Sequence, residues 1–377
     1  MYRCWKRLLV PLVLTTHRAS TTLAFRQTPF LRKTTAATTA SSSFRKTTTR
    51  TNMSTTATDV IPGRPTWQQT MLRIKDPAAS IKFYENLGFT LIDTFDFPQY
   101  KFSLYFMTTL PAGETYTLKP GTQAAHDYLW NMEGVALELT HNHGTESDPN
   151  SKPYHAGNQE KDGFGHVAVN VDDVYAASAK LEAAGCSFKK KPDEGRMKGL
   201  AFVYDPDGYW VELVKRGDNA NIPNEYNFSQ TMLRIKDPKK SLDFYQKLGM
   251  KVLRESHYPD AKFSLYFLGS SNVPDGTDVK TMFAPVLELT HNHGTEDDES
   301  FRHYNGNEEG RQGFGHIGFL VDDVYAACDA LRPMNYGFRK EPDGGSMKGL
   351  AFAYDPDGYS VEIIKRGGLD FGDVKKE

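Results

Sequence analysis

Two sets of glutamine, glutamate and histidine residues occur in parallel along the chain. Each set has a Gln in a QTMLR motif, a Glu in LELTH, a His in GFGH and a Glu shortly after DPDGY. The first set is Gln69, Glu138, His166 and Glu212, and the second is Gln230, Glu288, His316 and Glu362. One amide oxygen, one imidazole and two carboxylates can bind a divalent metal ion and leave coordination positions for water or substrate, as a catalytic site requires. Any single Gln or Glu is better explained as a half-exposed strand residue, but scattered surface residues have no reason to recur together on the same strands.

The recurrence extends to whole domains. QTMLRIKDP occurs at Gln69–Pro77 and again at Gln230–Pro238, and KFSLYF, LELTHNHGTE, GFGH and MKGLAF also occur twice. Self-similarity at such a long period indicates a duplicated domain. The offset between the copies is 161 residues through KFSLYF and 150 afterwards, so the first half has 11 additional residues between Met107 and Glu133. This Gly-, Thr- and Pro-rich segment is predicted to be a surface loop.

The hydrophobic periodicity alternates between strand and helix in a fixed order. In the first half, a strand at QTMLRIK precedes a helix from Asp76 to Gly88 and strands at LIDTF, KFSLYFM and VALELTH. The order then repeats with a strand at HVAVNV, a helix from Asp173 to Gly185, and strands near Phe188, at GLAFVY and at YWVELVK. The chain is therefore predicted to be α+β, with four βαβββ modules. The expected boundaries are 66–216 for domain 1, 217–225 for a linker, 226–367 for domain 2 and 368–377 for a tail.

Strand alternation predicts where the candidate ligands lie, because side chains at i and i+2 share one face of a sheet. In QTMLRIK, Gln69 and Arg73 lie on the polar face, opposite an apolar face that packs under a helix. In YWVELVK, Glu212 shares its face with Trp210 and Val214, an unusual setting for a carboxylate unless a cation meets it. Each module thus offers one ligand-type residue on its first strand and one on its last.

Composition indicates an ordinary globular protein, with 377 residues of which 24% are charged and 39% hydrophobic. The longest apolar run, LLVPLVL from Leu8, is too short to span a bilayer and contains a proline, so no membrane partner is expected. Of three cysteines, Cys186 and Cys328 lie in apolar helical patterns and are predicted to be reduced core residues.

Residues 1–58 are predicted to be a disordered targeting leader. They contain ten Lys and Arg and no acidic residue among many Ser and Thr, which is typical of a transit peptide to a plastid or a mitochondrion. Met53 provides a start for a cytosolic form. Without the leader, 45 − 10 = 35 basic residues face 47 acidic ones, a net charge of about −12, which argues against a nucleic-acid partner.

The chain resembles glyoxalase I (lactoylglutathione lyase) of the vicinal oxygen chelate superfamily. QTMLR, KFSLYF, LELTHN, GFGH, MKGLAF and DPDGYWVE carry the resemblance, which covers nearly everything from about Trp67 to Arg366, twice. The resemblance implies two pseudo-symmetric domains with curved mixed sheets, fused so that one chain replaces a dimer and acts as a monomer. It also implies that each metal site takes Gln and Glu from one half and His and Glu from the other.

Two composite sites follow from the resemblance. One comprises Gln69, Glu138, His316 and Glu362, and the other comprises Gln230, Glu288, His166 and Glu212. The implied reaction isomerises the hemithioacetal of methylglyoxal and glutathione to S-lactoylglutathione, which detoxifies methylglyoxal. The metal ion would stabilise an enediolate by Lewis-acid polarisation, and by analogy with the family Glu212 and Glu362 would transfer the proton.

The family's pattern also implies residues that bind glutathione. Arg73 and Asn142 in one site, and Arg234 and Asn292 in the other, would bind its γ-glutamyl end. Arg73 lies four strand residues beyond Gln69 on the same face, about 13 Å away at roughly 3.3 Å per residue, which suits a tripeptide thiol.

The sequence departs from the family at two positions near the glutathione site. Where the animal enzyme has an arginine before GFGH, this chain has Asp162 and Gln312, with Arg311 displaced by one residue. Where the family has a lysine before MKGLAF, Arg196 stands in the first half and Ser346 in the second. Arg196 and Arg311 are therefore further candidates for substrate binding, and the two sites are expected to differ.

The sequence also contains histidines that are not expected to bind the metal ion. His141 and His143 lie where a strand runs into a loop, and they are predicted to be solvated or hydrogen-bonded rather than metal ligands. A shell containing Gln resembles the zinc-dependent class, with nickel or cobalt as alternatives. A ring-cleaving dioxygenase would need a shell of two His and one carboxylate, and a non-enzymatic ligand-binding member would not need all four ligands in both halves. Neither the organelle, nor activity at both sites, nor the use of glutathione over another thiol follows from the sequence.

Overall fold

The computed structural model describes residues 60–345 and 347–369. The predicted leader with Met53, Ser346 and residues 370–377 of the predicted tail lie outside the described residues. No helix in the described part of the chain is long and apolar enough to cross a membrane.

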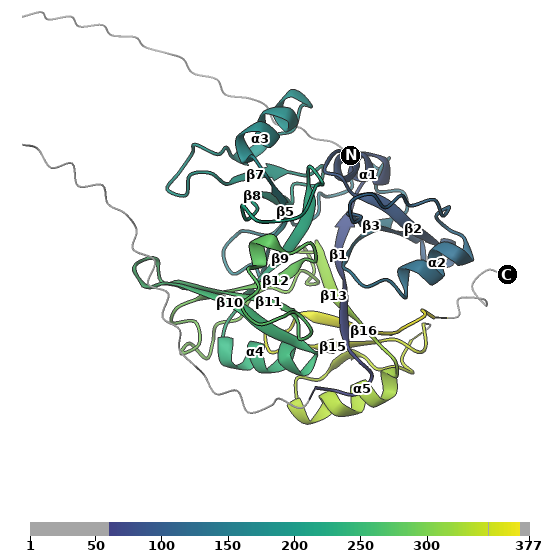
Figure 1. Cartoon of the computed structure of the whole chain (residues 1–377). Coiled ribbons are helices and arrows are strands. Elements are labelled where there is room, and N and C mark those ends of the chain that lie inside the picture. Colours follow the sequence, from purple (N-terminus) through teal and green to yellow (C-terminus); the bar gives the residue numbers. More distant parts are fainter. Residues whose placement is uncertain (1–59, 346, 370–377) are drawn as a thin grey trace, which may run out of the picture. The chain divides into compact units, whose positions relative to one another are not determined.

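The described chain contains four βαβββ modules, as predicted, and the fold class is α+β (Figure 1). The first half comprises β1 (Thr66–Ile74), α1 (Pro77–Asn86), β2 (Thr90–Phe97), β3 (Phe102–Thr108), α2 (Gln123–Leu129), β4 (Ala136–Asn142), β5 (Phe164–Val171), α3 (Val174–Ala183), β6 (Phe188–Lys190), β7 (Ala201–Tyr204) and β8 (Trp210–Lys215). The second half comprises β9 (Asn227–Ile235), α4 (Pro238–Lys247), β10 (Met250–Tyr258), β11 (Phe263–Ser270), β12 (Val286–Asn292), β13 (Phe314–Val321), α5 (Val324–Leu331), β14 (Phe338–Lys340), β15 (Ala351–Tyr354) and β16 (Ser360–Lys365). Short 3-10 turns occur at Pro98–Tyr100, Pro259–Ala261, Val279–Thr281 and Arg332–Met334.

An aspartate begins the main helix of every module. The Asp76 carboxylate accepts hydrogen bonds from the backbone N–H groups of Ala78 and Ala79, which α1 leaves without an intrahelical partner. Asp173, Asp237 and Asp323 cap α3, α4 and α5 in the same way. These caps fix the point at which each strand turns into its helix, and therefore the place of the strand below it.

The strands form two eight-stranded sheets, and each sheet combines one module from each half. The first sheet has the order β14-β15-β16-β13-β1-β4-β3-β2, and the second has the order β10-β11-β12-β9-β5-β8-β7-β6. Antiparallel pairing of β1 with β13 joins the halves in the first sheet, and antiparallel pairing of β5 with β9 joins them in the second. The sequence repeat thus divides the chain into two consecutive halves, whereas each sheet contains one module from each half.

Buried polar contacts hold the two modules of each half together. The Tyr84 hydroxyl on α1 donates a hydrogen bond of 3.0 Å to Asp205 in the DPDG turn of the neighbouring module. The Tyr209 hydroxyl in turn donates to the carbonyl of Arg73 at 2.9 Å. Tyr245 and Asp355 repeat the first contact in the second half at 2.7 Å. The repeated DPDG turn is therefore a docking point for a helix of the preceding module.

The segment between Met107 and Glu133 is not only a surface loop, so the prediction for it was wrong. It contains the helix α2, in which Leu129 is fully buried. Together with Trp130, Leu129 packs into a second hydrophobic cluster with residues of the first sheet, including Phe106 and Leu320. The Gly, Thr and Pro residues around the helix concealed a short amphipathic run that tertiary contacts stabilise.

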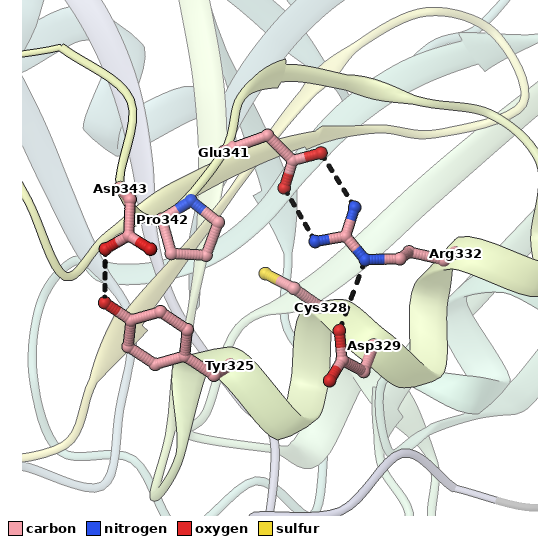
Figure 2. Close-up of a pocket in the computed structure, with 7 residues that line it drawn as sticks. All are labelled: Tyr325, Cys328, Asp329, Arg332, Glu341, Pro342 and Asp343. Atoms are coloured by element: carbon pink, nitrogen blue, oxygen red, sulfur yellow. Dashed lines mark hydrogen bonds and ion pairs between the residues drawn. The ribbon is translucent and has the colours of Figure 1, made fainter.

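The free cysteines are packing residues, as predicted, but Cys186 lies in the loop after α3 and not in a helix. Cys328 on α5 is fully buried, and Cys186 is partly buried against the main core. Figure 2 shows Cys328 at a surface pocket beside α5, where Arg332 donates two hydrogen bonds to Glu341 and Tyr325 donates one to Asp343. Burial raises the pKa of the Cys328 thiol to about 12, which makes it a poor nucleophile.

We predict that Tyr84→Phe lowers the free energy of unfolding by about 1–3 kcal/mol, because it removes a donor from the buried Asp205 carboxylate. Equilibrium urea unfolding measures this change. Tyr175→Phe is the matched control, because its hydroxyl makes the same kind of bond to Asp193 at an exposed position and its loss should cost less than about 0.5 kcal/mol. Equal losses in the two variants would show that the helix contact with the DPDG turn does not stabilise the fold.

Candidate metal centres

The structure brings both predicted composite sets together. In the first sheet, the Nε2 atom of Gln69 lies 2.6 Å from Glu138, 2.7 Å from Glu362 and 3.1 Å from the Nε2 atom of His316. In the second sheet, the Nε2 atom of Gln230 makes the corresponding contacts of 2.7, 2.9 and 3.3 Å with Glu288, Glu212 and His166. All eight side chains are buried. We refer to these sets as the first-sheet and second-sheet clusters.

The strand register accounts for the convergence of the first-sheet cluster. Met71 lies opposite both His316 on β13 and Glu138 on β4, and Gly318 lies opposite both Gln69 and Glu362. Paired residues in neighbouring strands project from the same face, so the ligand-type side chains all point to one side. A Cβ atom at Gly318 would lie 2.6 Å from the Cγ of Gln69, so the glycine leaves the space that the glutamine occupies.

Two carboxylates control the charge on the histidine of each cluster. Burial alone lowers the pKa of His316, but Glu138 and Glu362 outweigh it and raise the pKa to about 9. Glu212 and Glu288 likewise raise the pKa of His166 to about 9 against its burial. A buried pair of carboxylates requires a positive partner, and without a metal ion the imidazolium supplies it.

The residues of both clusters fit a divalent metal ion. The ligand atoms of Glu138, His316 and Glu362 lie within 4.8 Å of one another, and so do those of His166, Glu212 and Glu288. The Oε1 atom of Gln69 is buried without a hydrogen-bond partner. The imidazole nitrogen and the carboxylate oxygens of each cluster are donors of the kind that bind first-row divalent ions, and the unpartnered amide oxygen is a further donor.

The two arginines predicted to bind glutathione are held by loops of the opposite half. Arg73 donates to the carbonyls of Gly306, Gly313 and Phe314 and to the Oδ1 atom of Asn307 at 2.8 Å. Arg234 makes the corresponding bonds, including one of 2.8 Å to Asn158. These asparagines were not predicted from the sequence, although a Gly-Asn pair precedes GFGH in both halves.

Three of the other predicted binding residues are exposed at the surface. Asn142 is exposed and donates to the Tyr154 hydroxyl at 2.8 Å, and Asn292 is exposed. Arg196 is exposed in the loop before β7. The structure thus leaves these three side chains accessible to a solute.

Arg311 has a partner that the sequence analysis did not foresee. Its guanidinium donates to the buried Asp162 carboxylate at 3.0 Å and lies 4.0 Å from the ring centroid of Tyr304. His155 contacts the same carboxylate at 2.7 Å. Asp162, which stands where the animal enzyme has an arginine, thus has its charge balanced by these neighbours.

A lysine near each cluster was also missed. Lys190 donates to the carbonyl of Leu200 at 2.6 Å, and Lys340 donates to the carbonyl of Leu350 at 2.7 Å. Burial lowers the pKa of both lysines, while Glu212 and Glu362, respectively, act to raise it. The sequence contains a signal for these residues, because a lysine occupies this position in both repeats.

His141 and His143 are hydrogen-bonded as predicted and take no part in either cluster. His141 lies 2.8 Å from Glu146, and His143 lies 2.8 Å from the Ser103 hydroxyl. His291 and His293 repeat these contacts in the second half, with Glu296 and Ser264. These histidines recur in both halves because they make the same contacts where each strand runs into its loop.

Comparison with known proteins identifies relatives that cover most of the chain. The Glyoxalase/Bleomycin resistance protein/Dioxygenase superfamily matches residues 66–213 and 227–363. Glyoxalase I of Saccharomyces cerevisiae is 43% identical over 310 residues, covering 79% of this chain and 91% of the yeast protein. Lactoylglutathione lyase of Schizosaccharomyces pombe is 41% identical over 302 residues, covering 79% and 95%.

Solved structures agree with the sequence relatives. Glyoxalase I from Zea mays matches with a TM-score of 0.59 at 27% identity, covering 80% of this chain and 92% of the maize chain. Its similarity extends over both halves and therefore over the strands that carry both clusters. The chain belongs to the glyoxalase/bleomycin resistance protein/dioxygenase superfamily, as a two-domain relative of glyoxalase I.

Proposed function

We propose that the protein is a lactoylglutathione lyase that isomerises the hemithioacetal of methylglyoxal and glutathione to S-lactoylglutathione. The observation that carries this proposal is the pair of buried clusters, each with one Gln, one His and two Glu drawn from both halves of the chain. The names of the yeast relatives, glyoxalase I and lactoylglutathione lyase, agree with it. The same geometry disfavours a ring-cleaving dioxygenase, because each cluster has only one histidine.

The hydrogen bonds distinguish the two glutamates of each cluster. Thr140 donates to the Oε1 atom of Glu138 at 3.0 Å, and Gln69 donates to its Oε2 atom, so both oxygens are engaged. Glu362 accepts from Gln69 through Oε2, and its Oε1 atom has no donor among the described residues. Thr290 repeats the first contact with Glu288 at 3.4 Å in the second sheet. Glu362 and Glu212 are therefore the carboxylates with an oxygen free to move a proton.

The proposed chemistry divides between the bound ion and these carboxylates. A metal ion held by either cluster would act as a Lewis acid on the two substrate oxygens and acidify the C–H bond of the carbon that bears sulfur. Glu362 or Glu212 removes the proton from that carbon and returns it to the adjacent carbon, while the hydroxyl proton of the first carbon passes to the oxygen of the second, so that a thioester carbonyl and a new hydroxyl form.

We further propose zinc as the ion, because imidazole nitrogen and carboxylate oxygen are common zinc ligands; nickel and cobalt are the alternatives. One chain would suffice for activity, since both clusters form within a single polypeptide. Arg73 with Asn142, and Arg234 with Asn292, would bind the γ-glutamyl end of glutathione, with Arg196 and Arg311 as further candidates. The leader of residues 1–58 would direct the protein to a plastid or mitochondrion.

We predict that the double variant Glu212→Gln/Glu362→Gln loses at least about 100-fold in kcat, because a positioned general base contributes at least that much. Growth of thioester absorbance from methylglyoxal and glutathione measures the rate. Each single variant should retain turnover at one site, and Glu146→Gln, which changes an accessible carboxylate outside the clusters, should act like the unmodified protein. Full turnover by the double variant would exclude the proposed bases.

Metal content provides a test that does not depend on turnover. After dialysis, the protein should retain about two metal ions per chain, one for each cluster, and His316→Ala should retain about one. His141→Ala is the control and should retain about two, because His141 contacts Glu146 rather than either cluster. Two ions in His316→Ala/His166→Ala would place the metal elsewhere.

Localisation can be tested with fluorescent fusions. Residues 1–58 fused to a fluorescent protein should enter an organelle, because the segment is basic, rich in Ser and Thr and free of acidic residues. A chain that begins at Met53 should stay in the cytosol. Cytosolic fluorescence from both fusions would contradict the assignment of a transit peptide.

A further inference from the structure

The two sheets differ on their ligand-bearing faces, at the end farther from Arg73 in the first sheet and from Arg234 in the second. β1 runs from Gln69 towards Arg73, and the antiparallel β13 runs the other way, from His316 towards Leu320. In the first sheet this far end is apolar, because Leu320 packs in a buried cluster with Ile364 and Trp130. It forms a wall beside the first-sheet cluster.

The second sheet has a polar residue in this wall. Asn170 is the counterpart of Leu320, four residues after His166 on the same face of β5. It is 3% exposed, and its Oδ1 atom is buried without a hydrogen-bond partner. A buried acceptor without a partner destabilises the protein, so a donor from a bound molecule would relieve it.

The two sheets also differ in polarity at their edge strands. In the first sheet, Asp93, Phe106 and Glu138 lie side by side in register on neighbouring strands. The Asp93 carboxylate is fully buried against the imidazole of His126 on α2, so the inserted helix covers this edge.

The equivalent row of the second sheet is open and cationic. Arg254 and Phe267 lie in register with Glu288, and the guanidinium lies 5.5 Å from the centroid of the Phe267 ring. Among the described residues, Arg254 forms no ion pair with a carboxylate. Between β11 and β12, all of which the structure describes, the 3-10 turn Val279–Thr281 replaces the longer helix α2. Lys280 in this turn takes the place of Trp130, because the Lys280 carbonyl accepts from Gly217 as the Trp130 carbonyl accepts from Gly367.

We propose that the two sites select different substituents on the 2-oxoaldehyde. The first-sheet site takes apolar substituents, and the second-sheet site takes substituents that carry a hydroxyl or phosphate group, with Asn170 accepting from the hydroxyl and Arg254 pairing with the negative charge. The inference rests on the proposed function. In the hemithioacetal, the sulfur and the substituent are attached to different carbons, at opposite ends of the O–C–C–O unit, and Asn170 and Arg234 lie at opposite ends of the β5–β9 pair. A peptide that extends towards Arg234 therefore directs the substituent towards Asn170.

Single-site variants make this inference testable. Glu362→Gln leaves the second-sheet site in use, and Glu212→Gln leaves the first-sheet site. For each variant, kcat/KM is measured with the glutathione hemithioacetals of methylglyoxal, phenylglyoxal, hydroxymethylglyoxal and the phosphate ester of hydroxymethylglyoxal. We expect the ratio of the phosphate ester to phenylglyoxal to be at least about tenfold higher in Glu362→Gln than in Glu212→Gln. The two hydroxymethyl substrates separate the contribution of the hydroxyl from that of the charge.

The wall residues are tested in the single-site backgrounds. In Glu362→Gln, Arg254→Leu should reduce kcat/KM for the phosphate ester about tenfold, and Asn170→Leu should reduce the preference for hydroxymethylglyoxal. Lys239→Leu, which removes an exposed cation from α4, is the matched control and should change neither value. Because Arg254 lies at a partly exposed edge, its replacement tests the proposal even if Asn170→Leu fails to fold.

Equilibrium binding provides a readout that is independent of turnover. Titration calorimetry with S-benzylglutathione and S-(2-carboxyethyl)glutathione should show opposite preferences in the two single-site variants. Equal ratios in both variants, or a second-sheet site that accepts none of the four hemithioacetals, would overturn the inference. Failure of the unmodified protein to convert methylglyoxal would instead overturn the proposed function.

Discussion

Antiparallel pairing between strands of opposite halves is the constraint on which both clusters depend. β1 joins β13 in the first sheet, and β9 joins β5 in the second, so each cluster forms only when a strand of one half lies in register with a strand of the other. A slip of one residue would turn every side chain of the moving strand to the opposite face. Both joints contain register shifts on either side of the glutamine, which locally change the twist and the aim of the strand.

Contacts between the two modules of each half hold these strands in place. The DPDG turns hold α1 and α4 through the hydroxyls of Tyr84 and Tyr245, and Tyr209 and Tyr359 bond the backbone carbonyls of Arg73 and Arg234 on the strands that carry Gln69 and Gln230. Where the repeats meet, the hydroxyls of Thr70 and Thr231 lie 2.8 Å apart, on the strand face opposite the ligands. The ligand-bearing faces are thus supported from behind by buried polar contacts that have no part in catalysis.

Much of this architecture could be predicted from the sequence, because it follows from local patterns. Strand alternation placed Gln69 and Glu212 on ligand-bearing faces, and the duplication showed that their partners recur. Alternation alone does not say which modules share a sheet, since that depends on contacts between distant segments. The composite sets therefore came from the resemblance to a family rather than from periodicity. The structure places the members of each set within contact of one another.

The features that escaped prediction are all tertiary. The helix α2 has little intrinsic signal and is stabilised by packing of Trp130 and by the pairing of His126 with Asp93. The pairing of Arg311 with Asp162 joins residues from different halves, and no local pattern connects them. Lys190 and Lys340 resembled ordinary surface lysines until their burial and their neighbouring carbonyls were visible.

The exchange of modules between the sheets also determines how a duplicated enzyme can diverge. Each half supplies ligands to both clusters, yet each module belongs to only one sheet. An insertion in the first module, such as α2, therefore alters the surroundings of the first-sheet cluster and leaves the second-sheet cluster unchanged. The ligand residues cannot vary freely, because each cluster needs all four of them. The residues that form the walls beside the clusters carry no such constraint. Leu320 and Asn170, which occupy equivalent positions with opposite polarity, are wall residues of this kind.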